Sequence, residues 1–560
     1  MLGPGDLWYK DALIYSLDVE TFQDSDGDGI GDFPGLTTRV DYLRSLGVTC
    51  VWLQPFFPSP NRDNGYDVAD YYGVDPRLGT LGDFVDFLRL ARERGIRVMI
   101  DLAVNHTSDQ HPWFRAARAD RRSRYRDFYV WSDERPADAD EGMVFPGVES
   151  TTWTYDDIAG AWYFHRFYHF QPDLNLANPA VREEIRKVMG FWLELGVSGF
   201  RVDAAPFLVD RKGAGPSVVE RRRPHTFFRH MRSFLSWRLG DAALLAEANV
   251  LADDVADYVG TGDKLHMLFN FWVNQHLFLA LATETAAPLA GALRATASLP
   301  PTAQWAYFLR NHDELDLGRL ADAERAACYA AFGPDPAMQL YERGLRRRLA
   351  PMLGNDRARL ELAWSLLLAM PGTPVLYYGD EIGMGDLLTL PERDAVRTPM
   401  QWTPARSGGF SDAPAERLPR ALPEGEYGPE RVNVSDQQHD PNSLLNWVQR
   451  ALRVRKTCPE IARGAMTVLD AGDPRVLAIR YEHAGDALVT LHNLSATDCS
   501  LSLGDLGAGT PGESTELLSD QRYRRRATDV DHPDHAPPAG DGRLRVGPFG
   551  YRWLRLVRST

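Results

Sequence analysis

The chain has 560 residues, more than a single hydrophobic core usually supports, so two or three domains are expected. Apolar residues make up 44% of it and charged residues 25%, a balance typical of a folded globular protein rather than a disordered one. The net charge of −15 disfavours nucleic acid or an anionic membrane as a partner, and it excludes no neutral ligand.

Four cysteines lie far apart, and no two form a Cys-X-X-Cys pair. They are too few to cross-link a chain of this size, so we expect reduced, mostly buried thiols at Cys50, Cys328, Cys458 and Cys499. The first residues lack a basic segment followed by an apolar one, and no run approaches the ~18–20 apolar residues that cross a bilayer. We therefore expect a cytoplasmic protein with no membrane partner. Homo-oligomerisation stays open.

Short apolar runs alternate with amphipathic stretches up to about residue 457. Bounded runs of this length predict buried strands of a parallel sheet. We expect eight strands, at 13–19, 48–54, 97–104, up to 203, up to 247, at 267–271, up to 313, and from 374. Helical spacing is found at 38–46, 81–94 and 357–369. This pattern predicts an α/β fold, a (β/α)8 TIM barrel over residues 1–106 and 180–457.

The alternation breaks at 107–179, where aromatic residues are dense. A structureless loop of this length is improbable in a compact domain, so we expect an inserted subdomain after the third strand. It can cover a pocket as a lid, pack as a core, or do both.

From residue 458 to 560, β-like runs at 476–481, 487–492, 515–518 and 543–546 are separated by turn residues. They predict a C-terminal antiparallel β-sandwich domain. We expect it to be a stabilising cap rather than a glucan-binding module, because no cluster of exposed aromatic residues stands out there. The charged, proline-rich segment 522–541 reads as an exposed loop.

Three carboxylates are found where predicted strands end. Asp203 closes Gly-Phe-Arg-Val-Asp, Glu247 closes Leu-Leu-Ala-Glu, and Asp313 closes Phe-Leu-Arg-Asn-His-Asp. In a closed barrel these strand ends converge on one pocket. An acid there costs desolvation energy, which usually indicates a function. Two carboxylates, one protonated and one ionised, are the minimum needed to cleave a glycosidic bond.

Residues 24–32 form a loop in which acids alternate with glycines. The predicted ligands of a hard cation, Ca²⁺ or Mg²⁺, are the side chains of Asp24, Asp26, Asp28 and Asp32 and the backbone oxygen of Ile30. The loop is not an EF-hand, because its twelfth position is Gly35 rather than Glu. The alternative is an unliganded turn, in which the crowded carboxylates would repel one another.

Together these motifs resemble the α-amylase superfamily, glycoside hydrolase family 13. The four signature regions match Asp-Leu-Ala-Val-Asn-His at 101–106, the 199–203 run, Glu247, and Asn-His-Asp at 311–313. Gln-Pro-Asp-Leu-Asn at 171–175 resembles the oligo-1,6-glucosidase branch. Further segments most resemble the trehalose synthases of that branch, the maltose α-D-glucosyltransferases, and lie at 22–33, 105–114, 126–133, 244–249, 308–315, 346–353 and 397–402.

The resemblance implies a role for each acid. Asp203 would be the nucleophile that forms a β-glucosyl-enzyme intermediate. Arg201, two residues earlier on the same strand face, would keep it ionised. Glu247 would act as general acid and then base, with its pKa raised by apolar neighbours. Asp313 would bind hydroxyls of the distorted sugar.

Further substrate contacts are implied at Tyr66, Asp67, His106, Gln171, His312 and Arg397. Asp67 and Arg397 resemble a pair that clamps the glucose at the non-reducing end, and Tyr66 would stack beneath that ring. Such a clamp closes the pocket at one end and favours transfer of one glucose. The alternative is a surface ion pair.

The resemblance also implies a second Ca²⁺ between barrel and insertion, and no organic cofactor. Its ligands would be Asn105, Asp173, Asp210 and the backbone oxygens of Phe207 and Leu208. The relatives carry Glu at the position of Asp210, so this chain departs from their pattern there.

Two activities share the covalent intermediate, and the substrate would be a small α-glucoside such as maltose or trehalose. If the released glucose is retained and attacks, the two disaccharides interconvert; if water enters, the enzyme is an exo-acting α-glucosidase. The basic stretch 217–225 departs from the trehalose-synthase pattern and leaves this choice open. A non-catalytic relative acting as a scaffold should have lost one of the three acids, and all are present.

Overall fold

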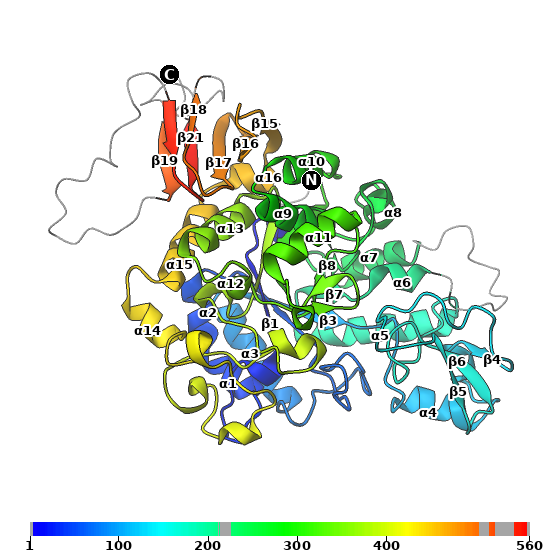
Figure 1. Cartoon of the computed structure of the whole chain (residues 1–560). Helices are drawn as coiled ribbons and strands as arrows, with labels where there is room; N and C mark the ends of the chain where they lie inside the picture. The colour runs from blue at the N-terminus through cyan, green and yellow to red at the C-terminus, as the bar shows by residue number, and fades with distance from the viewer. Residues whose placement is uncertain are drawn as a thin grey trace.

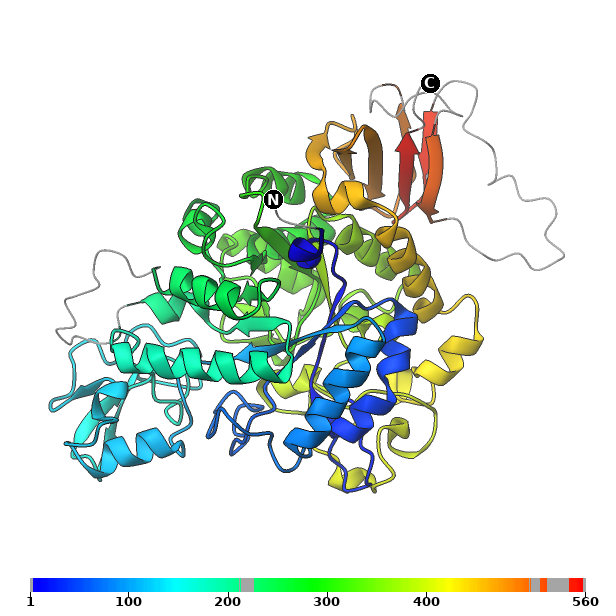
Figure 2. The same cartoon turned by 180° about the vertical axis from the view of Figure 1, so that it is seen from behind.

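The computed structural model describes residues 4–210, 212, 226–502, 504, 514–520 and 543–556. The basic stretch 217–225 and the predicted loop 522–541 lie outside these residues. The described chain forms a central barrel, with one small sheet projecting beyond helix α5 (Pro179–Leu195) and further sheets near the C-terminus (Figure 1). These two additions lie at opposite ends of the molecule in both views (Figure 2).

Eight parallel strands close into a barrel in the order β1-β14-β10-β9-β8-β7-β3-β2. Their bounds are β1 Ile14–Leu17, β2 Cys50–Leu53, β3 Arg97–Leu102, β7 Gly199–Val202, β8 Ala243–Ala246, β9 Met267–Phe269, β10 Gln304–Phe308 and β14 Thr373–Tyr377. The predicted (β/α)8 fold is confirmed. Every barrel strand is buried, as its apolar sequence indicated.

Alternation along the strands divides the barrel into two apolar layers. Residues such as Ile14, Met99 and Leu245 pack together inside the barrel. Their neighbours in sequence, such as Tyr15 and Ile100, belong to the large cluster between strands and helices. Successive side chains of a strand point to opposite faces. The pairing of the strands therefore decides which residues fill the barrel and which face the helices.

A 3₁₀ turn before the barrel, Pro4–Lys10, closes the N-terminal ends of the strands. Tyr9 belongs to the interior cluster, and its hydroxyl donates to Thr302 O at 2.7 Å. Trp8 Nε1 donates to Asp241 O, also at 2.7 Å. These contacts reach residues just before β10 and β8, so the pocket opens at the opposite end.

The helices that cover the strands include the three predicted stretches. The bounds of the barrel helices are α1 Phe33–Thr38, α2 Val40–Leu46, α3 Leu81–Glu93, α5 Pro179–Leu195, α6 Ala205–Val209, α7 Thr226–Arg238, α8 Val255–Val259, α9 Phe271–Thr283, α10 Ala287–Ala295, α11 Asp322–Phe332, α12 Leu349–Met352, α13 Arg357–Ala369, α14 Val434–His439, α15 Leu444–Lys456 and α16 Pro459–Arg463. Thr80 is the N-cap of α3 and forms a capping box with Asp83.

Three short strands, β11 Leu315–Asp316, β12 Gln339–Leu340 and β13 Gly344–Leu345, pair beyond β10.

The seventh barrel strand is shorter than predicted. Strand β10 ends at Phe308, and Asp313 lies in the loop that follows rather than at the strand end. The Asn274 amide donates to Phe308 O at 2.7 Å and to Leu309 O at 3.2 Å, so a side chain takes the acceptors that a neighbouring strand would use.

The inserted segment holds a three-stranded antiparallel sheet in the order β4-β6-β5. The elements are α4 Pro112–Ala119, β4 Trp131–Ser132, β5 Trp153–Asp156 and β6 Ala161–Phe164. Trp153 and Phe164 pair across β5 and β6 and form a small core of their own. The segment is therefore not the structureless loop that was judged improbable.

The C-terminal part consists of two antiparallel sheets, one of five strands in the order β15-β16-β17-β21-β19 and one of two strands, β18-β20. The bounds are β15 Ala465–Leu469, β16 Val476–His483, β17 Asp486–Asn493, β18 Cys499–Ser502, β19 Ser514–Ser519, β20 Arg543–Val546 and β21 Tyr551–Leu556. All four predicted runs are strands. The sequence analysis missed β15, β18 and β21.

Two further expectations concern the cysteines, which should be reduced and buried, and membrane-spanning segments. All four thiols are unpaired and buried. Within the described residues, no helix is both long and apolar enough to cross a membrane.

Candidate active site

One guanidinium joins the two carboxylates that are expected to do the chemistry. Arg201 Nη1 donates to Asp203 Oδ1 at 2.6 Å, and its Nη2 donates to Glu247 Oε2 at 2.5 Å. Nη1 also contacts both oxygens of Asp101, at 3.0 and 3.1 Å. The parallel register pairs Asp101 of β3 with Arg201 of β7, so both point into the barrel. Sequence reasoning missed Asp101, although an acid inside an apolar strand was a signal for it.

Burial and Arg201 act in opposite directions on these acids. Burial raises the pKa of Asp203 well above its usual range, and Arg201 opposes that rise. Burial also raises the pKa of Asp101 to about 6 against the same guanidinium. The predicted contact of Arg201 with Asp203 is present, and the positive charge of Arg201 favours the ionised carboxylate against the effect of burial. Glu247 is more open, with 28% of its side chain exposed.

Asp313 lies among positive groups on another side of the pocket. Its Oδ1 accepts from Arg393 Nη1 at 2.9 Å and from Arg397 Nη2 at 3.1 Å. Its Oδ2 lies 3.1 Å from His312 Nε2. Burial raises the pKa of Asp313, but the positive charges around it, which include Arg393 and Arg397, outweigh burial and bring the pKa below its usual range. These neighbours favour the ionised form of Asp313.

Two buried histidines each have a ring nitrogen without a hydrogen-bond partner among the described residues, namely His106 Nε2 and His312 Nδ1. His312 Nε2 lies 2.8 Å from the hydroxyl of Tyr66, and the two rings stack at 5.5 Å. Burial lowers the pKa of His106 to about 4 and that of His312 well below its usual value, so both are neutral near pH 7. Unpaired buried polar atoms are uncommon in proteins, and ligand hydroxyls would satisfy these two.

The structure does not pair Asp67 with Arg397. Asp67 Oδ1 accepts from Ser59 Oγ at 2.8 Å and Oδ2 accepts from Arg62 N at 3.2 Å, so this carboxylate stabilises its own loop. Arg397 instead donates through Nε to His312 O at 2.8 Å, besides its contact with Asp313. The clamp predicted from these two residues is therefore wrong as a pair, because both are bound to other groups.

Asp63 and Arg393 form an ion pair of the kind that was predicted for the clamp. Arg393 Nη2 donates to Asp63 Oδ1 at 2.7 Å while its Nη1 reaches Asp313. Gln171 Nε2 donates to the other oxygen of Asp63 at 2.9 Å. Sequence reasoning missed Asp63 and Arg393. Each lies four residues before the residue that was predicted, so the correct loops were found and the wrong members chosen.

Aromatic side chains of the insertion contact residues of this pocket. The guanidinium of Arg393 lies 4.8 Å from the ring centroid of Phe145, and the ring of Phe167 lies 5.1 Å from that of His106. The insertion therefore packs on its own core and also covers ligand-facing residues.

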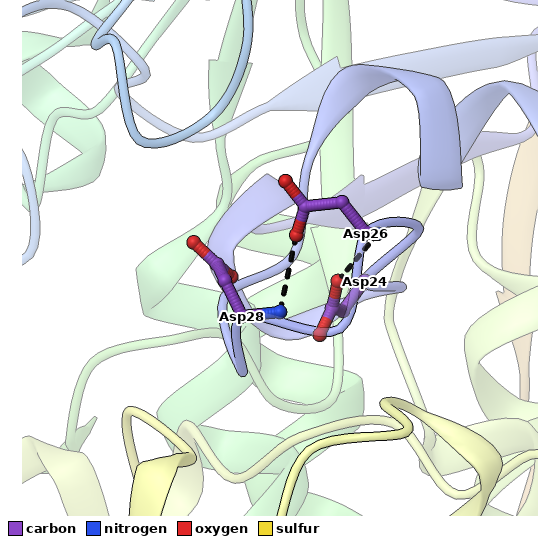
Figure 3. A group of neighbouring side chains, drawn as sticks. All are labelled: Asp24, Asp26 and Asp28. Atoms are coloured by element: carbon purple, nitrogen blue, oxygen red, sulfur yellow. Dashed lines mark hydrogen bonds between the residues drawn. The ribbon is translucent and has the colours of Figure 1, made fainter.

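The acidic loop gathers three carboxylates within 4.8 Å of one another, those of Asp24, Asp26 and Asp28 (Figure 3). Asp24 is buried, and its Oδ1 accepts from Asp26 N at 3.0 Å. Asp32 does not belong to this group. It caps α1 through Oδ1, which accepts from Gly35 N at 2.6 Å, and its negative charge still acts on Asp28.

A lysine lies where the second Ca²⁺ was predicted. Lys212 Nζ donates to Asn105 Oδ1 at 2.6 Å and to Asp173 Oδ2 at 2.9 Å. Asn105 and Asp173 are fully buried, whereas Asp210 is exposed. The donor set does not fit a metal ion, because two of its main oxygen ligands already bind a cation.

Comparison with known families agrees with this geometry. The model of the alpha amylase catalytic domain matches residues 15–330 and 345–464. The matched segments include nearly all of the barrel together with Asp203, Glu247 and Asp313. The chain belongs to the α-amylase family. Glycoside hydrolase family 13, to which the motifs pointed, is confirmed.

Similar proteins are named trehalose synthase or trehalulose synthase. "Trehalose synthase/amylase TreS" of Mycolicibacterium smegmatis is 46% identical over 504 residues, covering 87% of this chain and 84% of its own. The trehalose synthase of Pimelobacter is 43% identical over 510 residues, with 88% of each chain covered. The crystal structure of the trehalulose synthase MutB from Pseudomonas mesoacidophila superposes with a TM-score of 0.77 at 25% identity, covering 99% and 100% of the two chains.

Proposed function

We propose that this enzyme is a retaining α-glucoside-active enzyme that interconverts maltose and trehalose by intramolecular glucosyl transfer, with some hydrolysis. One observation carries the proposal: Arg201 binds Asp203 and Glu247 through the two ends of one guanidinium. Carboxylates that share a guanidinium lie close together. A short separation favours the retaining geometry, about 5–5.5 Å, over the inverting one, about 6.5–9.5 Å.

In the first step Glu247 gives its proton to the glycosidic oxygen while Asp203 attacks C1 of the glucosyl ring. The C1–O bond breaks, glucose leaves, and a β-glucosyl ester forms on Asp203. In the second step the Glu247 carboxylate takes a proton from the anomeric hydroxyl of the freed glucose. That oxygen attacks C1, the ester bond breaks, and trehalose forms with the Asp203 carboxylate restored.

The groups around the acids suit a single glucosyl ring. Asp313 is ionised and accepts from hydroxyls, and the unpaired nitrogens of His106 and His312 can bind others. The ion pair of Asp63 and Arg393 would close the pocket beyond this ring, in place of the predicted clamp. The binding energy from such contacts positions C1 against Asp203.

What accepts the glucosyl group decides between transfer and hydrolysis. The insertion, through Phe145 and Phe167, covers residues of the pocket and would exclude water. The alternative, an exo-acting α-glucosidase that hydrolyses short α-glucosides, is favoured by the partial exposure of Glu247. The word amylase in a relative's name also fits this alternative. A scaffold role without catalysis is disfavoured, because all three acids are present and ordered by arginines.

The test is to incubate the pure protein with maltose, and separately with trehalose, and to follow the products by NMR. We expect both disaccharides to appear from either one, with free glucose as a minor product. The Asp203→Ala variant should lose at least 10³-fold in rate, roughly the loss seen when a nucleophile is removed. Glucose as the sole product would reject the isomerase and leave the hydrolase.

We also propose a structural Ca²⁺ at the acidic loop. Asp24, Asp26 and Asp28 would hold it with the backbone oxygen of Ile30, since hard oxygen donors are the ligands that Ca²⁺ prefers. The ion would offset two of the three negative charges of these neighbouring carboxylates. Asp24 also accepts from Ser411 Oγ at 2.5 Å, so the ion would stabilise a contact between two distant loops.

Other expectations remain proposals. Residues 1–106 and 180–457 would form the catalytic barrel, 107–179 the lid and 458–560 the C-terminal domain. A cytoplasmic location and a possible homo-oligomer stay predictions.

A further inference from the structure

Lys212 brings a buried positive charge between the barrel and the insertion. Its ammonium group donates to Asn105 O at 3.0 Å, Asn105 Oδ1 at 2.6 Å and Asp173 Oδ2 at 2.9 Å. An ammonium carries three N–H donors, so these three acceptors use all of them. Asn105 and Asp173 are fully buried, and only 7% of the Lys212 side chain is exposed. Lysine is seldom buried unless it is paired, as it is here.

The acceptors of Lys212 are the oxygens that the family resemblance assigns to a second Ca²⁺. Ca²⁺ takes about six to eight oxygen ligands at about 2.3–2.6 Å. With the ammonium at 2.6–2.9 Å from Asn105 Oδ1 and Asp173 Oδ2, a second cation on the same oxygens would be strongly repelled. Phe207 and Leu208 lie in α6, and Asp210 at its end is exposed but close enough for its negative charge to raise the pKa of Lys212, so the ammonium rather than a metal ion takes the central place among these groups.

We propose that Lys212 replaces the metal ion at this position, so that the chain binds no Ca²⁺ there. The ammonium contacts the carboxylate of Asp173, and the opposite charges of Arg166 and Asp210 act on it from further away. Both oxygens of that carboxylate are satisfied: Oδ1 accepts from Arg166 N at 2.9 Å, and Oδ2 accepts from Lys212 and, at 3.1 Å, from Asn105 Nδ2. A buried charge pair with complete hydrogen bonding is the arrangement that a low-dielectric site tolerates.

The ammonium also positions a residue of the pocket. Asn105 precedes His106, and His106 pairs with Asp173 in an isolated antiparallel bridge. By holding Asn105 against Asp173, Lys212 fixes the segment that presents His106. Lys212 is therefore a positioning residue that acts through Asn105. This consequence for catalysis rests on the proposed function, whereas the replacement of the ion does not.

The test counts Ca²⁺ ions per chain by equilibrium dialysis of full-length protein against ⁴⁵Ca²⁺ in 0.15 M KCl, about physiological ionic strength. The starting chain is the double variant Asp26→Asn/Asp28→Asn, which removes two carboxylates of the acidic loop. Lys212→Ser is added to it, and Lys187→Ser is added separately as the matched control. Lys187 is 55% exposed and pairs with Glu184 on the surface.

We expect the double variant to bind no Ca²⁺. Addition of Lys212→Ser should let the chain bind about one ion, because removal of the ammonium group frees oxygen ligands in a buried site. Lys187→Ser should gain none. An ion still bound by the double variant with Lys212 intact would overturn the proposal, as would a folded Lys212→Ser chain that gains no ion. If Lys212→Ser does not fold, the double variant alone decides: a retained ion overturns the proposal and none supports it. Failure of Ca²⁺ binding at the acidic loop of the parent chain would leave this comparison unchanged.

Discussion

At the residue scale, arginines organise the pocket as much as the acids do. Arg201 bridges Asp203 and Glu247, and Arg393 bridges Asp63 and Asp313. The planar guanidinium presents its donors in a rigid fork, so one side chain can fix two carboxylates at once. A lysine in the same place would contact one of them well and leave the other without this contact.

Arg393→Lys should therefore reduce activity while leaving the fold intact. We expect kcat/KM on maltose to fall about 10–100-fold, or about 1.4–2.7 kcal/mol of transition-state stabilisation, because either Asp63 or Asp313 loses its hydrogen bond to residue 393. Arg325→Lys is the matched control, since Arg325 pairs with the exposed Asp322 on the surface. Its kcat/KM should stay within about twofold of the parent, as expected of a surface ion pair. Equal kcat/KM values for the two variants would show that Asp63 and Arg393 do not serve the reaction.

At the scale of elements, short polar segments after the strands hold the functional groups. The acidic loop follows β1 and runs directly into α1, whose N-cap is Asp32. Its backbone amides bond to its own carboxylates, as in Ile30 N to Asp28 Oδ1 at 2.7 Å. The loop conformation is therefore fixed by the sequence before any ion binds.

Calcium should stabilise the protein through this loop. At a Ca²⁺ concentration about 100 times its Kd, the free energy of unfolding should rise by about 2.7 kcal/mol, measured as a rise in Tm of a few degrees. The double variant Asp26→Asn/Asp28→Asn should show no rise, whereas Asp253→Asn, at an exposed acid elsewhere, should behave as the parent. A Ca²⁺-dependent Tm that survives in the double variant would locate the stabilising ion elsewhere.

At the scale of the whole molecule, the C-terminal sheets are anchored on barrel helices. Trp553 of β21 is fully buried, and its Nε1 donates to Ser365 Oγ of α13 at 3.0 Å. Ser365 also lies 2.9 Å from His492 Nε2 of β17. This buried contact supports the expectation that the sheets stabilise the barrel.

Trp553→Ala should lower the free energy of unfolding by about 3–5 kcal/mol, because it leaves a cavity between sheet and helix. At 25 °C, where the variant stays folded, kcat on maltose should be unchanged, since no contact of Trp553 reaches the pocket. Trp237→Ala is the control, because Trp237 is 92% exposed and its loss should leave Tm nearly unaltered. A large fall in kcat of folded Trp553→Ala would mean that the sheets take part in catalysis.

The barrel could be predicted from the sequence because its strands are continuous apolar runs. The acids that follow these strands could be predicted as well. The sequence did not show which of two similar side chains in one loop would face the pocket. Asp63 and Asp67 are the same residue type four positions apart, and only the packing shows that Asp67 bonds to its own loop while Asp63 meets Arg393. Lys212 was missed for a related reason, since a lysine beside a basic stretch gives no sign that it is buried against Asp173.

The pairing that closes the barrel also sets the order in which this chain can fold during its synthesis. Strand β1 pairs with β14, joining Ile14 to Val375 across most of the barrel sequence. At roughly 5–20 residues per second, a ribosome needs about 20–70 s to make the chain between them. Throughout that time β1 has one unpaired edge, and such edges are where unfinished chains aggregate. Completion of the sheet is therefore a late event in the synthesis of this chain.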